Sequence, residues 1–449
     1  MSAADFLVRG FVAFGDREAV IWNGRSTTYS WLAAAVDSAR EDIRRRKIES
    51  GDIVGLEADF SPASVALLLA LIEHDCIVVP LPSEQDQSNN DKLDIAQVRH
   101  LLVVRDSEEI VHTARPAPPG HAFYERLREL RAPGLVLFTS GTSGVPKATV
   151  HNLALLLDKF RAARTAQRTI NFLLFDHIGG LNTLFHTLAN GGVVVTVRDR
   201  SPDAVCSLIA QHPVEVLPTS PTFLNLLLIS EAYQRHDLSS LKVISYGTEP
   251  MPQSTLDRLV ELFPGIALKQ TYGLNELGIL RSRSRDSASL WMQVGGEGYE
   301  IRVVDGILQI KASSAMLGYL NAPSPFTDDG YFVTGDAVEE AGGYLRVLGR
   351  RSEQINIGGE KVYPAEVEEV IRQLANVAEV VVYGEKNQIM GSIVCAKINL
   401  IEPEDAAGCV ARIKRECRLR LASAKVPVKI KIETAPLYGR RLKVVRRHE

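Results

Sequence analysis

The sequence predicts an α/β protein with a large N-terminal domain of mainly parallel sheets flanked by helices, a β-rich subdomain, and a small α+β C-terminal domain. Strand-like and helix-like segments alternate in the N-terminal part of the chain, which is typical of parallel sheets. From about Gly298 to Arg350 the segments are short strands joined by turns such as Asp305-Gly306. Residues 351–449 again mix helices with strands and have the length of a small domain. We therefore place the two domains at 1–350 and 351–449, with the β-rich subdomain at about 298–350.

Individual elements follow from apolar runs whose lengths fit strands or helices. In the N-terminal domain, the predicted strands include Asp16–Asn23, Ile53–Leu56 and Cys76–Leu81, and the predicted helices include one capped by Ser30 that ends near Arg46 and one over Ala63–Glu73. In the C-terminal domain, helices are predicted over Pro364–Leu374 and Glu404–Leu421, and strands over Val380–Tyr383, Ser392–Ile398 and Val428–Glu433.

Composition narrows the class of protein. A chain of 449 residues with 45% hydrophobic and 23% charged residues fits a soluble globular protein of more than one domain. The net charge of −3 gives no indication of a nucleic-acid or membrane surface, and no apolar run has the length of a membrane span. The five cysteines lack metal-ligand spacing, and the N-terminus does not resemble a signal peptide. We therefore expect a cytoplasmic protein without nucleic-acid or membrane partners.

One stretch has the composition of a phosphate-binding loop. The apolar run Leu135–Phe138 is followed by small and hydroxyl-bearing residues and then by Lys147. Small residues let backbone N–H groups approach a ligand, hydroxyls add donors, and the lysine adds a positive charge. No G-K-[ST] closes the loop, so the pattern differs from a Walker motif. The loop residues are Thr139, Ser140, Gly141, Thr142, Ser143 and Gly144.

The whole string TSGTSGVPKA resembles the phosphate-binding signature of the ANL superfamily of adenylate-forming enzymes, which includes acyl-CoA synthetases, peptide-synthetase adenylation domains and luciferases. The resemblance extends from Asp16 to Arg447, with the motifs in family order. It implies an ATP-dependent, AMP-forming ligase with a mobile C-terminal lid. ATP and Mg²⁺ would be its cofactors, and CoA its probable co-substrate.

The segment QTYGLNELG resembles the family motif YG-x-T-E. The resemblance implies that Tyr272 packs on adenine and that Glu276 holds Mg²⁺ against the phosphates. It also makes Gly273, which lies between them in the sequence, a candidate for nucleotide contact. Asn275 stands where the family usually has threonine; an amide can hydrogen-bond a phosphate but is bulkier.

Two further segments imply nucleotide contacts. SYGTEPMP resembles the loop that lines the adenine pocket, with Gly247, Thr248 and Glu249 as contact candidates. YFVTGD places Asp336 where the family binds both ribose hydroxyls, and Arg350 matches a linker arginine that also reaches the ribose.

The segment DHIGGLN resembles the acyl-pocket segment of acyl-CoA synthetases, where His177 would border the pocket and the attacking carboxylate. Alternatively, His177 is a packed or surface histidine, or Asp176 neutralises a substrate amine. Neighbouring residues of a strand face opposite ways, so we do not expect both to line the pocket.

The segment GRRSEQINIGGEKVYPAEVEE resembles the family's hinge and first lid segment. Gly358 and Gly359 would enter the site for the second half-reaction, where a pantetheine tunnel leaves room only for backbone without Cβ. Ser352 occupies the usual hinge aspartate position, which keeps a small polar residue there.

The tail PLYGRRLKVVRR stands where the family has P-x-x-x-x-G-K, whose lysine bridges the carboxylate and the α-phosphate. Arg440 follows Gly439, and Lys443 is the nearest lysine. We expect Arg440 to dock over the α-phosphate. The alternatives are a shifted register that brings in Lys443 and a solvated basic tail.

The expected activity is conversion of a small or medium carboxylic acid to an acyl-adenylate, followed by transfer to CoA or to a carrier-protein pantetheine. A non-thiol acceptor such as an amine, diazotisation with a nitrogen oxyacid, and a degenerate nucleotide-binding protein remain alternatives. The resemblance also leaves a homodimer open.

Overall fold

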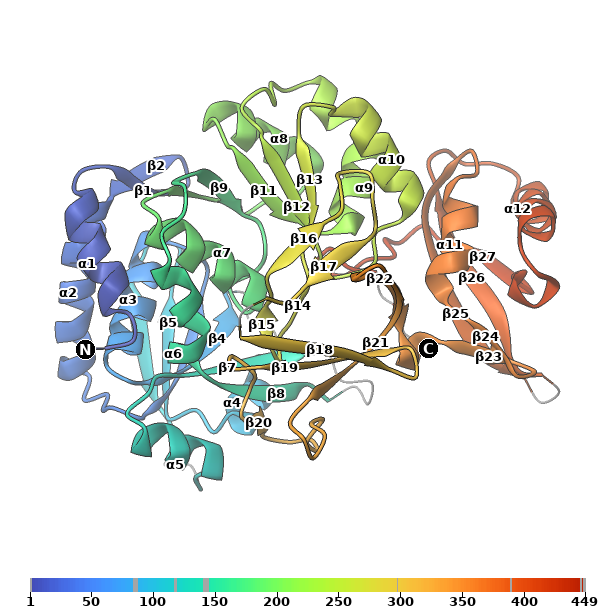
Figure 1. Ribbon diagram of the computed structural model, residues 1–449. Helices are drawn as coiled ribbons and strands as arrows, with labels where there is room; N and C mark the ends of the chain where they lie inside the picture. Colours follow the sequence, from blue (N-terminus) through green and yellow to red (C-terminus); the bar gives the residue numbers. More distant parts are fainter. Residues whose placement is uncertain are drawn as a thin grey trace.

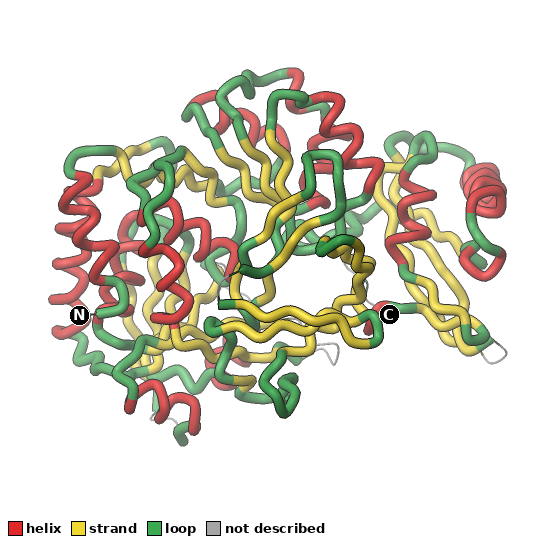
Figure 2. Tube along the Cα trace, viewed as in Figure 1, coloured by secondary structure: helices red, strands yellow, loops and turns green. Residues whose placement is uncertain are grey.

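The computed structural model describes residues 2–83, 88–116, 119–139, 145–296, 298–387, 390–444 and 446. Figure 1 shows a large N-terminal body and a smaller C-terminal body set beside it. Figure 2 shows that both bodies combine helices with strands, which confirms the predicted α/β class. None of the helices in these ranges is long and apolar enough to cross a membrane.

The first large sheet has a parallel centre and antiparallel edges. Its strand order is β20 (Gly318–Tyr319), β8 (Lys147–Asn152), β7 (Gly134–Thr139), β4 (Ile77–Pro82), β3 (Ile53–Ala58), β5 (His100–Val104) and β6 (Ile110–Ala114). Strands β7, β4, β3 and β5 are parallel. Because helices cover both faces, β3 and β4 are buried at every position. The covering helices are α1 (Asp5–Phe14), α2 (Tyr29–Arg45) and α3 (Pro62–Glu73) on one face, and α4 (Ser88–Ile95) and α5 (Ala122–Glu129) on the other.

The predicted cap of α2 was wrong by two residues. Thr28 is the N-cap, and its side-chain oxygen accepts a hydrogen bond from the backbone N–H of Trp31 at 3.1 Å. Ser30 lies within the first turn. A threonine is a favoured N-cap because its hydroxyl satisfies one of the unpaired N–H groups of the first turn.

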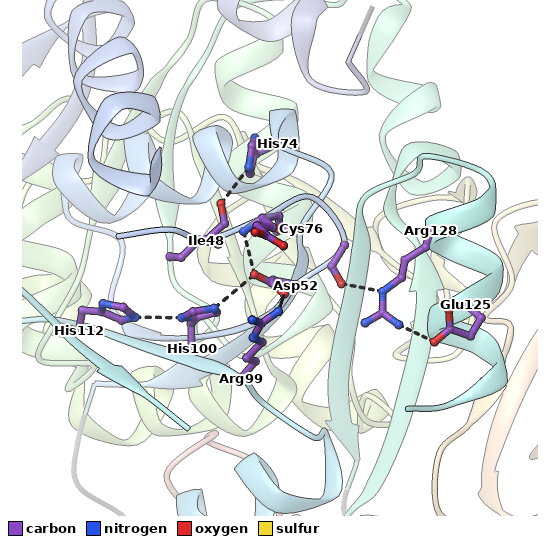
Figure 3. Close-up of polar contacts among 11 residues, drawn as sticks. Ile48, Asp52, His74, Cys76, Arg99, His100, His112, Glu125 and Arg128 are labelled. Atoms are coloured by element: carbon purple, nitrogen blue, oxygen red, sulfur yellow. Dashed lines mark hydrogen bonds and ion pairs between the residues drawn. The ribbon is translucent and has the colours of Figure 1, made fainter. Parts of the chain in front are cut away.

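A polar cluster joins β3, β5 and β6 at the edge of this sheet (Figure 3). Asp52 accepts hydrogen bonds from Arg99 and from the backbone of Glu49, each at 2.7 Å. Its other neighbour is His100, whose Nδ1 lies 3.0 Å from Nε2 of His112. These contacts connect strands far from the motifs above and stabilise the N-terminal sheet.

The second large sheet is parallel except at one edge. Its order is β13 (Ala267–Gln270), β12 (Val243–Tyr246), β11 (Val216–Thr219), β9 (Arg168–Asn171), β10 (Val193–Thr196), β1 (Glu18–Trp22) and β2 (Arg25–Thr28). Only β2 runs antiparallel to its neighbour. The helices of this part of the chain are α6 (Leu153–Asp158), α7 (Ile178–Ala189), α8 (Pro202–Gln211), α9 (Pro221–Ser230) and α10 (Gln253–Leu262).

A third, antiparallel sheet forms the β-rich subdomain. Its order is β16 (Ser282–Ser284), β17 (Met292–Val294), β22 (Tyr344–Arg350), β21 (Phe332–Ala341), β19 (Ile307–Ala312) and β18 (Tyr299–Val304). The sheet therefore begins before the predicted boundary near residue 298. Strands β16 and β17 are only three residues long, too short to show the alternation that identifies a strand. The hairpin β14 (Gly273–Leu274) and β15 (Gly278–Ile279) lies between this sheet and the second one in sequence.

The C-terminal domain has its own hydrophobic core. The buried residues of this core come from the part of the chain between Ile355 and Cys417. Helices α11 (Pro364–Arg372) and α12 (Ala406–Arg420) accompany the hairpin β23 (Ile355–Ile357) and β24 (Glu360–Val362) and the sheet β25 (Val377–Asn387), β26 (Gly391–Leu400) and β27 (Lys429–Ile432). The chain then returns to the N-terminal domain, where Leu442 joins the core of the second large sheet. This return places the tail between the two domains.

Candidate active site

The predicted phosphate loop connects strands β7 and β8. Thr139 ends β7 and pairs across the hairpin with Lys147, the first residue of β8. Ser140, Gly141, Thr142, Ser143 and Gly144 lie outside the described residues, so the loop itself is not described. Its two ends are fixed by β7 and β8, as a strand–loop–strand phosphate cradle requires.

Tyr272, Asp336 and Arg350, which come from three separate motifs, lie together in one cluster. The phenol of Tyr272 donates to Asp336 at 2.6 Å, and Nε of Arg350 lies 2.7 Å from the other carboxylate oxygen. Asp336 is only 6% exposed. Burial raises the pKa of Asp336, whereas the Arg350 guanidinium opposes that rise. A buried carboxylate between an aromatic ring and a guanidinium is suited to a ribose with two hydroxyl donors.

The predicted adenine loop follows β12. A Cβ on Gly247 would lie 2.7 Å from the backbone oxygen of Thr271, so only glycine fits this approach. Thr248 adopts a left-handed backbone with φ 76°, and its hydroxyl is buried without a hydrogen-bond partner in the described part of the chain. Glu249 accepts hydrogen bonds from Thr222 and, at 3.2 Å, from the backbone of Val444. The loop is therefore held by both α9 and the tail.

The side-chain amide of Asn275 forms a hydrogen bond within the protein. Its Nδ2 donates to the carbonyl of Phe138 at 3.1 Å, next to the strand end that enters the phosphate loop. The backbone carbonyl of Asn275 lies 2.6 Å from Nε2 of His151, a residue to which no sequence motif pointed. Burial lowers the pKa of His151 to about 4, so the ring is neutral and donates through Nε2. Asn275 thus ties the YG motif to β7 and β8.

Glu276 and Lys147 approach each other through Tyr319, which sequence reasoning also missed. The Tyr319 hydroxyl donates to Glu276 at 2.8 Å, and the Lys147 ammonium lies 5.4 Å from the centre of the Tyr319 ring. No group of three or more acidic, histidine or cysteine side chains in the described ranges could hold a metal. A single carboxylate fits Mg²⁺ when substrate phosphates supply the other ligands.

His177 is the N-cap of α7, and its Nδ1 accepts from the backbone of Gly179 at 2.9 Å. Burial, with Lys443 and Arg441 nearby, holds the pKa of His177 well below its usual value. The expectation that Asp176 and His177 lie on a strand was wrong, because both lie between β9 and α7. Asp176 pairs with Arg441 at 2.6 Å, so a protein side chain occupies the place considered for a substrate amine.

The tail brings both Lys443 and Arg440 to a small cavity beside His177. Burial lowers the pKa of the Lys443 ammonium to about 8, and the nearby carboxylates of Glu249 and Asp336 oppose that shift. The preceding residue, Leu442, has φ 48°, a left-handed backbone conformation that glycine adopts most readily. Ser220 fixes this turn by donating to the Leu442 carbonyl at 2.7 Å.

Arg440 lies farther out. It lines a small cavity together with His177, Arg200 and Lys443, and its charge acts on Asp59, whose pKa is raised mainly by burial. This position borders the region beside His177 rather than the Asp336 cluster. Both the register expected from the sequence, with Arg440, and the shifted register, with Lys443, therefore bring a cation to the cavity beside His177.

Gly358 and Gly359 form the turn between β23 and β24, with φ 57° and 96°. Their backbone N–H groups bond to Met390 and Asn356, both in the C-terminal domain. Figure 1 shows this hairpin at the lower edge of the C-terminal body. In this orientation of the lid the tail, not the glycine pair, enters the site.

Comparison with known proteins gives two family matches. Residues 9–320 match the model of AMP-binding enzymes, and residues 366–437 match the model of their C-terminal domain. Among curated relatives, the chain is 26% identical to an indoleacetate–CoA ligase of Aromatoleum aromaticum, over 92% of this chain and 91% of the relative. It is also 26% identical to a feruloyl-CoA synthase of Amycolatopsis, over 91% and 90%.

Solved structures share the fold. The anthranilate CoA ligase AuaEII, in complex with anthranoyl-AMP, gives a TM-score of 0.84 at 21% identity, over 99% of this chain and 95% of that one. The amide bond synthetase McbA of Marinactinospora thermotolerans gives 0.76 at 21% identity, over 97% and 96%.

Proposed function

Because the chain belongs to the family of AMP-binding enzymes, the ANL adenylate-forming superfamily, we propose that it activates a carboxylic acid with ATP and passes the acyl group to a thiol. The observation that supports this most directly is the position of Lys443, which faces Asp336 and Glu249 beside His177. An ammonium there lies between the candidate nucleotide site and the candidate acid site.

We assign nucleotide binding to residues on or next to five strands, β8, β12, β13, β21 and β22. Asp336 and Arg350 hold the ribose, Tyr272 and the loop at Gly247 hold adenine, and Lys147 meets the phosphates. Mg²⁺, held by Glu276 and the phosphates, would supply charge neutralisation at the phosphoryl oxygens when bound. Such positioning and charge stabilisation provide most of the catalysis in phosphoryl transfer.

In the first step an oxygen of the acid carboxylate attacks the α-phosphorus. A new P–O bond forms, the bond to the bridging oxygen of pyrophosphate breaks, and pyrophosphate leaves with that electron pair. Lys443 donates hydrogen bonds to both repelling anions. His177 is neutral, so it packs beside the acid without adding charge.

In the second step a thiolate attacks the acyl carbon and forms a C–S bond. The bond between the acyl carbon and the bridging phosphate oxygen breaks, and AMP leaves with that electron pair. We assign the acceptor to the thiol of CoA or of a carrier-protein pantetheine, after rotation of the lid at Ser352. The glycine pair at 358–359 supports this assignment, because its left-handed turn presents backbone that could enter a narrow tunnel.

Acid-dependent exchange of labelled pyrophosphate into ATP tests the first step, screened over aromatic, aliphatic and amino acids. The same acids with and without CoA test the second step. Exchange without a CoA product, but with an amide formed from an added amine, would support a non-thiol acceptor; the likeness to an amide bond synthetase motivates that arm. Absence of exchange with every acid would refute the proposed ligase activity.

A further inference from the structure

We propose that Tyr319 and Asn321 are positioning residues that hold the metal carboxylate Glu276 and the phosphate lysine Lys147 at a fixed separation. The inference rests on the proposed roles of Glu276 and Lys147. No motif in the sequence pointed to either positioning residue.

Both residues belong to one short stretch, Ser314–Asn321, which we call the bridging segment. Its central residues form β20, which pairs antiparallel with β8, so that Tyr319 lies opposite Thr149. The bridging segment is therefore an added strand at the edge of the first large sheet, beside the strand that begins with Lys147.

One end of the bridging segment holds the metal carboxylate. The backbone N–H of Met316 donates to the carbonyl of Glu276 at 2.8 Å, and the hydroxyl of Ser314 donates to the carbonyl of Leu277 at 3.1 Å. The Tyr319 phenol then donates to Oε1 of Glu276 at 2.8 Å. Backbone and side chain of Glu276 are both fixed to this segment.

The other end holds the backbone around the lysine. The side-chain oxygen of Asn321 accepts from the N–H of Ala148 at 3.0 Å, and its amide donates to the carbonyl of Pro146 at 2.8 Å. The N–H of Leu320 also donates to the carbonyl of Ala148 at 2.9 Å. The residues on both sides of Lys147 are thereby clamped to the bridging segment.

Tyr319 also separates two opposite charges. Within the described part of the chain, Lys147 and Glu276 form no ion pair with each other; the ring of Tyr319 faces the ammonium, and its hydroxyl engages one carboxylate oxygen. The arrangement keeps the carboxylate available to a metal and the ammonium available to phosphate.

The test measures ATP affinity by calorimetry with and without Mg²⁺, which does not depend on turnover. Tyr319→Phe keeps the ring and removes the hydroxyl. We expect unchanged affinity for ATP alone and about a tenfold smaller gain from Mg²⁺, because the carboxylate loses its orienting hydrogen bond. Tyr331→Phe is the matched control, since its phenol donates to Glu300 at 2.9 Å on the surface of the β-rich subdomain.

Asn321→Leu tests the lysine end. We expect about a fivefold loss of ATP affinity both with and without Mg²⁺, because Lys147 meets phosphate directly. Asn376→Leu is the control, because Asn376 makes the same pair of backbone hydrogen bonds to Glu402, within the lid. Asn321→Asp keeps the acceptor and replaces this variant if the leucine does not fold.

An unchanged or larger Mg²⁺ gain in Tyr319→Phe, or equal losses in Asn321→Leu and Asn376→Leu, would overturn the inference. If the ATP affinity of the wild-type protein is the same with and without Mg²⁺, both the inference and the metal role of Glu276 are overturned. A normal Mg²⁺ response without acid-dependent pyrophosphate exchange would refute the proposed function and leave the inference standing.

Discussion

Replacing Lys443 with alanine should remove the cation that brings the acid carboxylate and the α-phosphate together. The side chain lies among Glu249, Asp336, Arg350 and Arg441, with its ammonium in the cleft rather than in open solvent. Alanine deletes that charge without adding volume, and the tail stays anchored because Ser220 bonds to the backbone of the preceding residue. We therefore expect loss of the adenylation step with little loss of folding.

The size of the effect follows from the charge. A unit charge about 4 Å from an anion contributes about 4 kcal/mol at the effective dielectric of about 20 that applies near protein surfaces. Each 1.36 kcal/mol corresponds to a tenfold rate change. We therefore expect Lys443→Ala to slow acid-dependent pyrophosphate exchange about a thousandfold. Arg440→Ala, the matched variant in the same tail, should change it by less than about tenfold.

The pH dependence provides an independent measurement. Lys443 acts as a cation, so the activity that depends on it is present below its pKa and is lost as the pH rises through about 8. Because kcat/KM reports ionisations of the free enzyme, kcat/KM for exchange should fall above that pH. Lys443→Arg should retain some exchange and move this fall to higher pH, since arginine stays charged.

Two results would refute this reasoning. A large loss in Arg440→Ala with full activity in Lys443→Ala would restore the register expected from the sequence. Full exchange activity in both variants would show that the tail is not catalytic.

Three other substitutions test the remaining site. Asp336→Asn should weaken ATP binding by about 1.5–3 kcal/mol, the usual contribution of a hydrogen bond to a charged group; unchanged affinity in calorimetry would remove Asp336 from the site. Gly359→Leu should spare pyrophosphate exchange and block acyl transfer, whereas Gly343→Leu, at another open left-handed turn with φ 77°, should spare both; loss of exchange as well would indicate a folding role. His151→Leu should raise KM for ATP several-fold by releasing Asn275, and wild-type kinetics would exclude that positioning role.

Sequence motifs indicated contacts that form between neighbouring strands. YFVTGD and GRR lie at the ends of neighbouring strands, so Asp336 and Arg350 meet directly across β21 and β22. Sequence motifs failed where contact depends on the fold. Arg441 and Asp176 are 265 positions apart, and Tyr319 and Glu276 are 43 apart. No local pattern marks such pairs, because each is formed by strands and a tail that only tertiary packing brings together.

The tail shows why counting residues from a motif does not by itself select between Arg440 and Lys443 as the proposed cation. Tyr438 and Val444 form a β-bridge, and inside it the N–H of Gly439 bonds to the carbonyl of Lys443 at 3.0 Å. The intervening residues therefore form a closed turn, with Arg440 on it and Lys443 at its base. Extra residues inside such a closed turn increase the number of residues between Pro436 and Lys443. They leave the two ends of the turn, Gly439 and Lys443, in contact with each other. The left-handed backbone at φ 48° in Leu442, directly before Lys443, is the local feature on which we base the proposal that Lys443 takes the place of the family lysine.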